Sequence, residues 1–403
     1  MKKRMNKEVI ILAALNLLFC FGVYVSLPVL ALYFNIQLDI PIAQVGFLLG
    51  IPPLITALFG SLGAAAANKF GEVKSLLIGI TLIITPYIFY LFTESYFVLI
   101  ALSVISGIGG ICWKPVIRAL FAHHSKELRN QNVVFRINYI VICLGAIAGP
   151  GLGLLLRDSQ MQLNLYISIF TFLCIIIIIL LVNSIIKPTN LQLEVKKKPS
   201  LQNFKEVDPR LFMYVTAGAL VFIVFSQFEG VFPLAFTEIS ENPAELFALL
   251  LIINSIAGIV FQFLVMYIED RFIKLGNLTS ILIGNFAFGA AFVIFALSEG
   301  QLLFLIIATL VFALGEVYAV PGSDIMINNI APDHKKSLYF GIAEFRTIGF
   351  SIGPIMGAAL IDIWGATILY WVCISIIVLT SVIYIVPSLP LYSRTKNHTN
   401  EVI

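Results

Sequence analysis

Eight ionisable side chains lie inside long apolar segments of this 403-residue chain. Such a group costs roughly 2.5–3.5 kcal/mol at the centre of a membrane, so it needs a partner or a wet cavity and often marks a binding or proton site. The three in the first half are basic and four of the five in the second half are acidic, which suggests attraction between the halves across a central cleft. The eight are Lys114, Arg118, Arg136, Glu229, Glu316, Asp324, Glu344 and Arg346.

Glu316 is the first candidate for a group that takes up and releases a proton. It lies about 13 residues from one end of its apolar segment, roughly 20 Å at 1.5 Å per residue, and so near mid-membrane. Away from water the charged carboxylate is destabilised, which favours proton uptake. Glu229 and Asp324 are further candidates for proton coupling. The alternative is a structural hydrogen bond to a neighbouring helix.

Lys114 and Arg118 are four residues apart and therefore lie on one face of a helix, with Pro115 between them favouring a kink. One interpretation places Lys114 on the wall of a substrate cavity and Arg118 at a gate. The other is a pair of side chains that reach toward the membrane surface.

Further polar and aromatic side chains occupy positions that would face a central cavity. Each has the alternative of simple packing. As candidate substrate-binding residues they join Lys114, and they are Trp113, Tyr24, Asn16, Asn138, Gln227 and Tyr318.

The elements that position these side chains are expected to be membrane-spanning helices. Hydrophobic residues make up 60% of the chain and charged residues only 12%, against roughly 25% charged in a soluble protein. The mean hydropathy of +1.00 extends over the whole length, which excludes a soluble globule. The apolar segments fall at about 9–34, 42–67, 75–92, 97–121, 132–156 and 162–186, and then at about 210–236, 244–268, 277–298, 301–329, 338–361 and 366–388.

These segments predict an all-α membrane protein with 12 transmembrane helices in two pseudo-symmetric six-helix bundles. The expected organisation is an N-terminal bundle at 1–186, a cytoplasmic linker at 187–209, and a C-terminal bundle with a short cytoplasmic tail at 210–403. Lys and Arg crowd the loops on one side, while the other side holds Arg157. The positive-inside rule therefore predicts a multi-pass protein of the cell (inner) membrane with both termini in the cytoplasm.

The two halves repeat each other. Gly145, Gly149, Pro150 and Gly153 recur in the second half with identical spacing, from Gly349 onward. Duplication of a six-helix unit explains the match. Because only small residues let helix backbones approach closely in lipid, we expect tight helix contacts at Gly145 and Gly149, and at Gly349 and Gly353.

Several function classes lack support in the sequence. The G-x4-G-K-[ST] nucleotide-binding motif is absent. If the chain moves a solute across the membrane, the energy must therefore come from an ion gradient. The five cysteines lie in apolar runs without a CxxC pair, and neither a metal site nor a cofactor is expected. No nucleophile pair or acid/base couple stands at catalytic spacing, so the chain is not expected to be an enzyme. We expect a monomer in the lipid bilayer that binds a small molecule and protons, and no nucleic acid.

With these helices and repeats, the chain resembles the major facilitator superfamily, and more narrowly its twelve-helix drug:proton antiporter group. Gly22 followed by Pro28 is similar to the group's first-helix motif, and the set that begins at Gly145 resembles its antiporter signature. Gly315 with Glu316 is also familiar from that group. Asn68 stands where the family's loop between helices 2 and 3 carries an acidic residue, and Ser103 where members often have arginine.

The resemblance implies alternating access, with the inner ends of helices 4, 5, 10 and 11 closing against each other. For this gate we predict that Arg118 pairs with Glu344 and Arg136 with Asp324. Arg346 offers both acidic residues a competing partner.

The function that these observations favour is secondary active transport, with proton-coupled export of a small organic or amphipathic molecule. The basic residues would suit an anionic metabolite such as a siderophore, and Glu229, Glu316 and Glu344 would suit a lipophilic cation. Import of an anionic metabolite or siderophore stays open, as does a transporter-like membrane receptor without flux.

Overall fold

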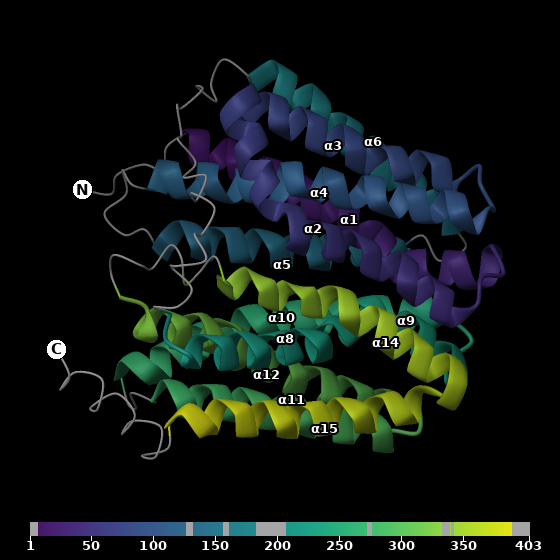
Figure 1. Ribbon diagram of the computed structural model, residues 1–403. Coiled ribbons are helices and arrows are strands. Elements are labelled where there is room, and N and C mark those ends of the chain that lie inside the picture. Colours follow the sequence, from purple (N-terminus) through teal and green to yellow (C-terminus); the bar gives the residue numbers. More distant parts are fainter. Residues whose placement is uncertain are drawn as a thin grey trace.

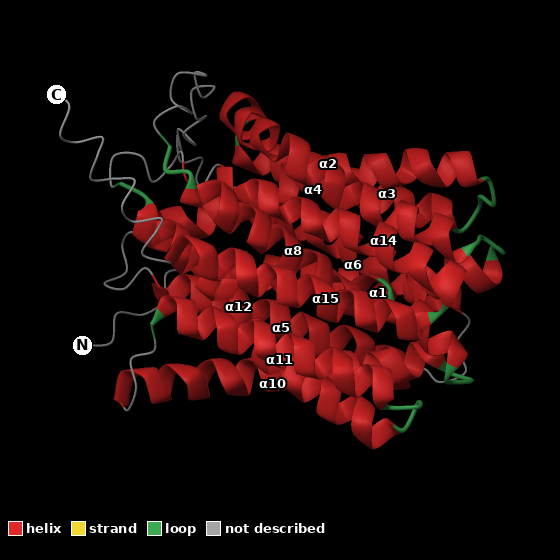
Figure 2. Cartoon of the chain, turned by 60° about the horizontal axis from the view of Figure 1, so that its bottom comes forward, coloured by secondary structure: helices red, strands yellow, loops and turns green. Residues whose placement is uncertain are grey.

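Helices make up nearly all of the structure, and the described residues contain no strand. The computed structural model describes residues 7–125, 132–155, 161–182, 207–271, 276–332, 339 and 342–388. Twelve long helices within these ranges run side by side, as Figure 1 and Figure 2 show from two directions. They are α1 (Lys7–Leu32), α2 (Ile42–Phe70), α3 (Glu72–Tyr90), α4 (Tyr96–Ser125), α5 (Asn132–Leu155), α6 (Met161–Val182), α8 (Arg210–Gly230), α10 (Pro243–Arg271), α11 (Asn277–Leu297), α12 (Leu302–Ile330), α14 (Gly349–Trp364) and α15 (Ala366–Ile385).

Eleven helical segments of the described chain can, by length and composition, cross a membrane; the first extends from α1 to Gln37, and the one that contains α14 begins at Glu344. In addition, α5 contains the shorter apolar stretch Ile140–Leu152. The prediction of an all-helical membrane protein is therefore confirmed. The start of α1 and the end of α15 lie at the same end of the helix array, which we call the terminal side.

Short elements interrupt or join the long helices where the sequence breaks the helical pattern. The expected segment 210–236 is in fact three elements, because Pro233 cannot donate a backbone hydrogen bond and the regular helix ends before it, at Gly230. The short elements are η1 (Tyr33–Gln37, a π-helix), α9 (Phe232–Ala235), and the 3₁₀ turns η2 (Phe236–Glu238), η4 (Glu344–Ile348) and η5 (Val386–Ser388).

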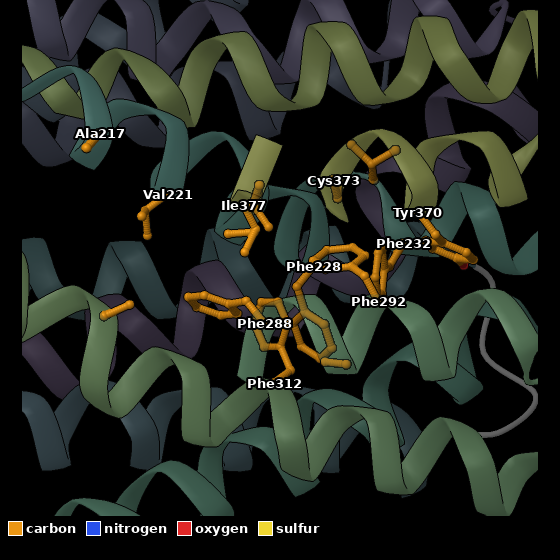
Figure 3. Packing of buried hydrophobic residues seen from close by; sticks show 14 of the residues in the cluster. Ala217, Val221, Phe228, Phe232, Phe288, Phe292, Phe312, Tyr370, Cys373 and Ile377 are labelled. Carbon is orange, nitrogen blue, oxygen red and sulfur yellow. The ribbon is translucent and has the colours of Figure 1, made fainter. Parts of the chain in front are cut away.

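Buried apolar side chains form two clusters, one for each set of six helices. The first cluster is built almost entirely from α1–α6, and the second draws on α8–α15. Figure 3 shows part of the second, where Phe228 and Phe288 pack on Phe312 with ring centroids 4.9 and 4.8 Å apart. Aromatic pairs at such distances add about 0.5–1.5 kcal/mol each beyond the area they bury. Each set of helices thus has its own core.

The repeated glycines lie where helices touch. A Cβ atom at Gly149 would meet the backbone nitrogen of Val25 on α1 at 2.7 Å, and Gly145 faces α1 in the same way. In the second half, Gly349 and Gly353 face α8, and a Cβ at Gly353 would lie 2.7 Å from the carbonyl oxygen of Ile223. The expected close packing at these four glycines is confirmed. The side-chain surroundings of Gly153 lie outside the described residues.

The two bundles meet mainly where α2 packs on α14 and α5 packs on α10. A Cβ at Gly50 would lie 2.7 Å from the carbonyl oxygen of Ser351, and Gly46 is equally close to α14 one turn earlier. These glycines lie in the first turns of α2, on the side opposite the terminal side. Within the described chain, the extensive contacts of α4 are with α1, α2, α3 and α5, helices of its own bundle.

The side chain of Glu238, in the segment after α8, forms a hydrogen bond with the start of α15. Gly365 has a φ of +83°, a conformation that suits glycine, and it leaves the first amide of α15 without a helical partner. The backbone N–H of Ala366 donates instead to Oε1 of Glu238 at 3.2 Å. Negative charge at a helix N-terminus is also favoured by the helix dipole.

We predict that Gly353→Ala destabilises the protein, whereas Gly60→Ala does not. The new methyl group at Gly353 would overlap Ser226 and the backbone of α8, and overpacking of this kind costs about 1–3 kcal/mol. Gly60 also lies in a helix but has open space around it, so alanine there should be neutral or stabilise by up to about 1 kcal/mol. Thermal unfolding of the purified protein in detergent measures both. Equal midpoints for the two variants would contradict the packing described here.

Candidate functional site

A cavity of about 40 Å³ lies between the two bundles, and its wall contains two of the three carboxylates that the sequence predicts for proton coupling, Glu316 and Glu229. At roughly 10–15 Å³ for each water, it has room for a few water molecules. Five helices contribute to its wall. The lining residues are Tyr24 of α1, Ile142, Cys143 and Ala146 of α5, Glu229 of α8, Leu251, Asn254 and Ser255 of α10, and Glu316 of α12.

Glu316 is the central residue of α12, about 21 Å along the axis from either end. Its carboxylate Oε2 accepts a hydrogen bond from Nδ2 of Asn254 at 3.2 Å. The side chain is partly buried, with its exposed part in the cavity. This position in a long apolar helix keeps the carboxylate far from both membrane surfaces.

Glu229 lies in the last turn of α8, where it meets the first bundle. Its Oε1 accepts a hydrogen bond from the phenol oxygen of Tyr24 at 3.0 Å, so this bond joins α1 to α8 across the boundary between the bundles. Lys114 of α4 has an exposed side chain and lies within electrostatic reach of Glu229. Glu229 also acts electrostatically on Glu316. When two carboxylates share a site, repulsion between their negative charges favours the state in which one of them is protonated.

Two of the predicted substrate-binding residues lie away from this cavity. Trp113 is completely buried in the first bundle and stacks on Phe19, with ring centroids 4.9 Å apart. Gln227 is completely buried as well, and its amide nitrogen Nε2 donates to the carbonyl oxygens of Ile223 at 2.8 Å and Gly353 at 2.9 Å. In this structure Trp113 contributes to a core, and Gln227 ties α8 to α14.

The other predicted substrate-binding residues have different positions. Asn16 is buried on α1 and Tyr318 is partly buried on α12, and neither belongs to the cavity wall. The side chain of Asn138 lies outside the described residues. Tyr24 is thus the predicted substrate-binding residue that the structure brings next to the carboxylates.

The predicted gate is only partly within the described structure. The side chains of Arg118, Arg136 and Asp324 lie outside it, so the two cross-bundle ion pairs remain predictions. Glu344 is exposed at the start of η4. Arg346 is buried, donates from Nη1 to Oγ of Ser323 at 2.9 Å, and lies with its guanidinium carbon 5.5 Å from the ring centre of Phe222. It is anchored within the second bundle.

Sequence reasoning did not single out Asn254, although it contacts Glu316. The signal was available, because Asn254 is an uncharged amide in the middle of the apolar segment 244–268. A polar side chain at such a position usually finds a hydrogen-bond partner on a neighbouring helix. Cys143 and Ser255 complete the polar part of the wall.

Comparison with known proteins agrees with this architecture. A family model described as Major Facilitator Superfamily matches residues 12–274 and 236–401, so the chain belongs to that superfamily. It is therefore a multi-pass membrane transporter and not an enzyme.

The curated relatives are distant but match along most of their length. The MFS-type transporter YqjV of Bacillus subtilis (strain 168) is 26% identical over 357 residues, which cover 85% of this chain and 83% of the relative. The quinolone resistance protein NorA of Staphylococcus aureus (strain MRSA252) is 22% identical over 371 residues, covering 89% and 91%. The multidrug resistance protein MdtH of Photorhabdus laumondii is 23% identical, covering 85% and 82%.

Solved structures share the fold at low sequence identity. The nucleoside transporter NupG superposes with a TM-score of 0.76 at 12% identity, over 94% of this chain and 99% of its own. A POT family transporter in complex with 5-aminolevulinic acid gives 0.76 at 17% identity, over 94% and 96%. The expected fold of two six-helix bundles is confirmed.

We predict that Tyr24 and Glu229 are energetically coupled, and that Tyr24 and Glu316 are coupled much less. Tyr24→Phe removes the phenol donor and Glu229→Gln removes the charge of the acceptor, so a double-mutant cycle isolates the part of their bond that depends on this charge. A hydrogen bond to a charged group is worth about 1.5–3 kcal/mol. Thermal unfolding of the single and double variants measures the coupling. The same cycle with Glu316→Gln is the control, and equal coupling in both cycles would contradict a direct bond.

Proposed function

We propose that this transporter exports small amphipathic molecules in exchange for protons, with Glu316 and Glu229 as the proton-binding groups. The observation that carries the proposal is the presence of two carboxylates in one small cavity between the bundles. The multidrug and quinolone resistance proteins among its relatives support export.

The geometry supports a competition between substrate and proton. A charged carboxylate buried between two bundles attracts a cation, and a protonated one does not. Each carboxylate also has a hydrogen-bond donor on another helix, Tyr24 for Glu229 and Asn254 for Glu316, so loss of charge weakens a defined bond. Protonation on one side of the membrane would release the substrate, and substrate binding on the other side would release the proton.

Alternating access would proceed by movement of one bundle against the other. The contacts of α2 with α14 lie on the side opposite the terminal side, near Gly46 and Gly50. We propose that this structure represents the state closed on that side. Because Tyr24 and Glu229 belong to different bundles, their bond would hold in this state and break in the other.

The cavity wall favours a cationic substrate over an anionic metabolite. It contains two carboxylates and, within the described chain, neither Lys nor Arg. Its apolar part, formed by Ile142, Ala146 and Leu251, would face the hydrocarbon portion of an amphipathic molecule once movement of the bundles has enlarged the cavity beyond the few water molecules that it can hold here. Lys114 lies within electrostatic reach of Glu229 without being part of the wall.

We predict that Glu316→Gln binds a cationic substrate more weakly, through the remaining carboxylate Glu229, and loses the dependence of transport on a pH gradient, since glutamine imitates the protonated acid. Proteoliposomes with an imposed pH gradient are tested with tetraphenylphosphonium as the cation and citrate as the anion. Glu241→Gln, an exposed acid before α10, is the matched control and should transport as the wild type does.

Each outcome of this experiment has a defined meaning. Accumulation that stays gradient-driven in Glu316→Gln would remove Glu316 from the mechanism and leave Glu229 or Asp324 as the coupling group. Proton-coupled uptake of citrate would favour an importer of anionic metabolites. Binding without flux in the wild type would favour a receptor.

A further inference from the structure

We propose that Asn254 is a hydrogen-bond switch that reverses what the cavity offers to a ligand when Glu316 changes its protonation state. With Glu316 charged, the amide oxygen of Asn254 is presented to a hydrogen-bond donor of the ligand. With Glu316 neutral, that oxygen accepts a hydrogen bond from the protonated carboxyl group of Glu316 instead. This inference deepens the proposed function, because it rests on proton uptake by Glu316.

The contacts of Asn254 are unequal at the two ends of its amide. Nδ2 donates to Glu316, while Oδ1 is buried and has no hydrogen-bond partner among the described residues. The side chain is 8% exposed and lines the cavity. Buried polar atoms almost always have a partner, so an unpartnered oxygen on a residue that lines the cavity marks a place for a donor. A water molecule or a ligand group in the cavity would supply it.

The orientation of the amide follows from the charge of Glu316. An ionised carboxylate only accepts hydrogen bonds, so the NH₂ group must face it and the oxygen must face away. A protonated carboxyl group carries an O–H donor. Half a turn of the Asn254 amide then pairs this O–H with the buried oxygen, satisfies both groups, and directs the NH₂ group into the cavity.

The charged and titratable groups around the amide decide which donor suits the open oxygen. Glu316 on α12 and Glu229 on α8 are both acidic, and Tyr24 on α1 is engaged with Glu229. Cys20 on α1 and Cys143 on α5 are the thiols nearby, and Lys114 on α4 acts on Glu229. The sequence of α11, which also packs on α12, has no titratable side chain. The ligand group that fits is therefore a positively charged donor, an ammonium that retains an N–H.

Two probes of equal charge separate this hydrogen bond from simple attraction between charges. N,N-dimethyl-1-naphthylmethylammonium carries one N–H, and its N,N,N-trimethyl analogue carries none. Binding of both to full-length protein in nanodiscs is measured by equilibrium dialysis, with the bound probe quantified by naphthalene fluorescence. The quantity of interest is the ratio of the two affinities from mildly alkaline to mildly acidic pH.

In the wild type, the dimethyl probe should bind about three- to tenfold more tightly than the trimethyl probe at alkaline pH, the range expected for one net hydrogen bond. The ratio should fall toward one as Glu316 takes up its proton. Glu316→Gln should hold the ratio near its acidic value at every pH, since the glutamine side chain imitates the neutral acid.

Asn254→Leu keeps the approximate size of the side chain and removes both the donor and the acceptor of the amide. The ratio of the two probe affinities in this variant should therefore be near one at every pH. Asn285→Leu is the matched control. Asn285 is also a buried asparagine of the second bundle with an unpartnered Oδ1 among the described residues, but it bonds to Ser381 at 3.1 Å and lies outside the cavity wall. Its ratio should follow the wild type.

A wild-type ratio of one at all pH values would overturn the proposal, and so would an unchanged ratio in Asn254→Leu or failure of both probes to bind. The wild-type pH profile alone decides the question if the leucine variant does not fold. If transport does not depend on the pH gradient but the ratio of probe affinities depends on pH, proton-driven export is overturned and the switch stays in place. Gradient-driven export together with a pH-independent ratio of the two affinities would overturn the switch and leave proton-driven export in place.

Discussion

The cost of placing a carboxylate in a hydrocarbon-like interior governs the rest of this structure. Two carboxylates lie deep in a chain that is 60% hydrophobic, and each has a specific hydrogen-bond donor on another helix. Neither donor is a fixed cation, so each carboxylate is stabilised without being locked in its charged form. The meeting point of the bundles is the place where such groups can have both a partner and access to water.

Packing within each bundle explains why change is expected between the bundles and not inside them. Close-packed cores respond to force as units and do not deform continuously. In the second bundle, rings from α8, α11 and α12 interlock around Phe312, as Figure 3 shows. The glycines of α14 also bring its backbone close against α8 within this bundle. The contacts between bundles are concentrated on two helix pairs, α2 with α14 and α5 with α10.

The sequence predicted the helices and their repeat well, because apolar length and glycine spacing are one-dimensional properties. It also placed Glu316 correctly along its helix. It was less informative about direction around a helix axis, since these helices are apolar on nearly every face and give no sign of which face is inward. The sequence therefore predicts Trp113 and Gln227 for the cavity, whereas the structure buries both side chains away from it. The amide of Asn254 in an apolar segment predicts a partner on another helix, but its contact with Glu316, 62 positions away, comes only from the fold.

The break after Gly230 has a mechanical consequence. Glu229 lies just before it, and just after it the chain makes two short turns that end at Glu238, which is fastened to the start of α15. Flexibility along α8 is thus concentrated at Val231, whose backbone is not helical, and in the Pro233 turn, which lacks one amide hydrogen. A tilt of α8 at this joint would move Glu229 more than the following segment, which is held at Glu238. The connection from Glu238 to the start of α15 can then keep one shape while the contact between α2 and α14 opens, so a molecule that binds this connection alone would not distinguish the two states.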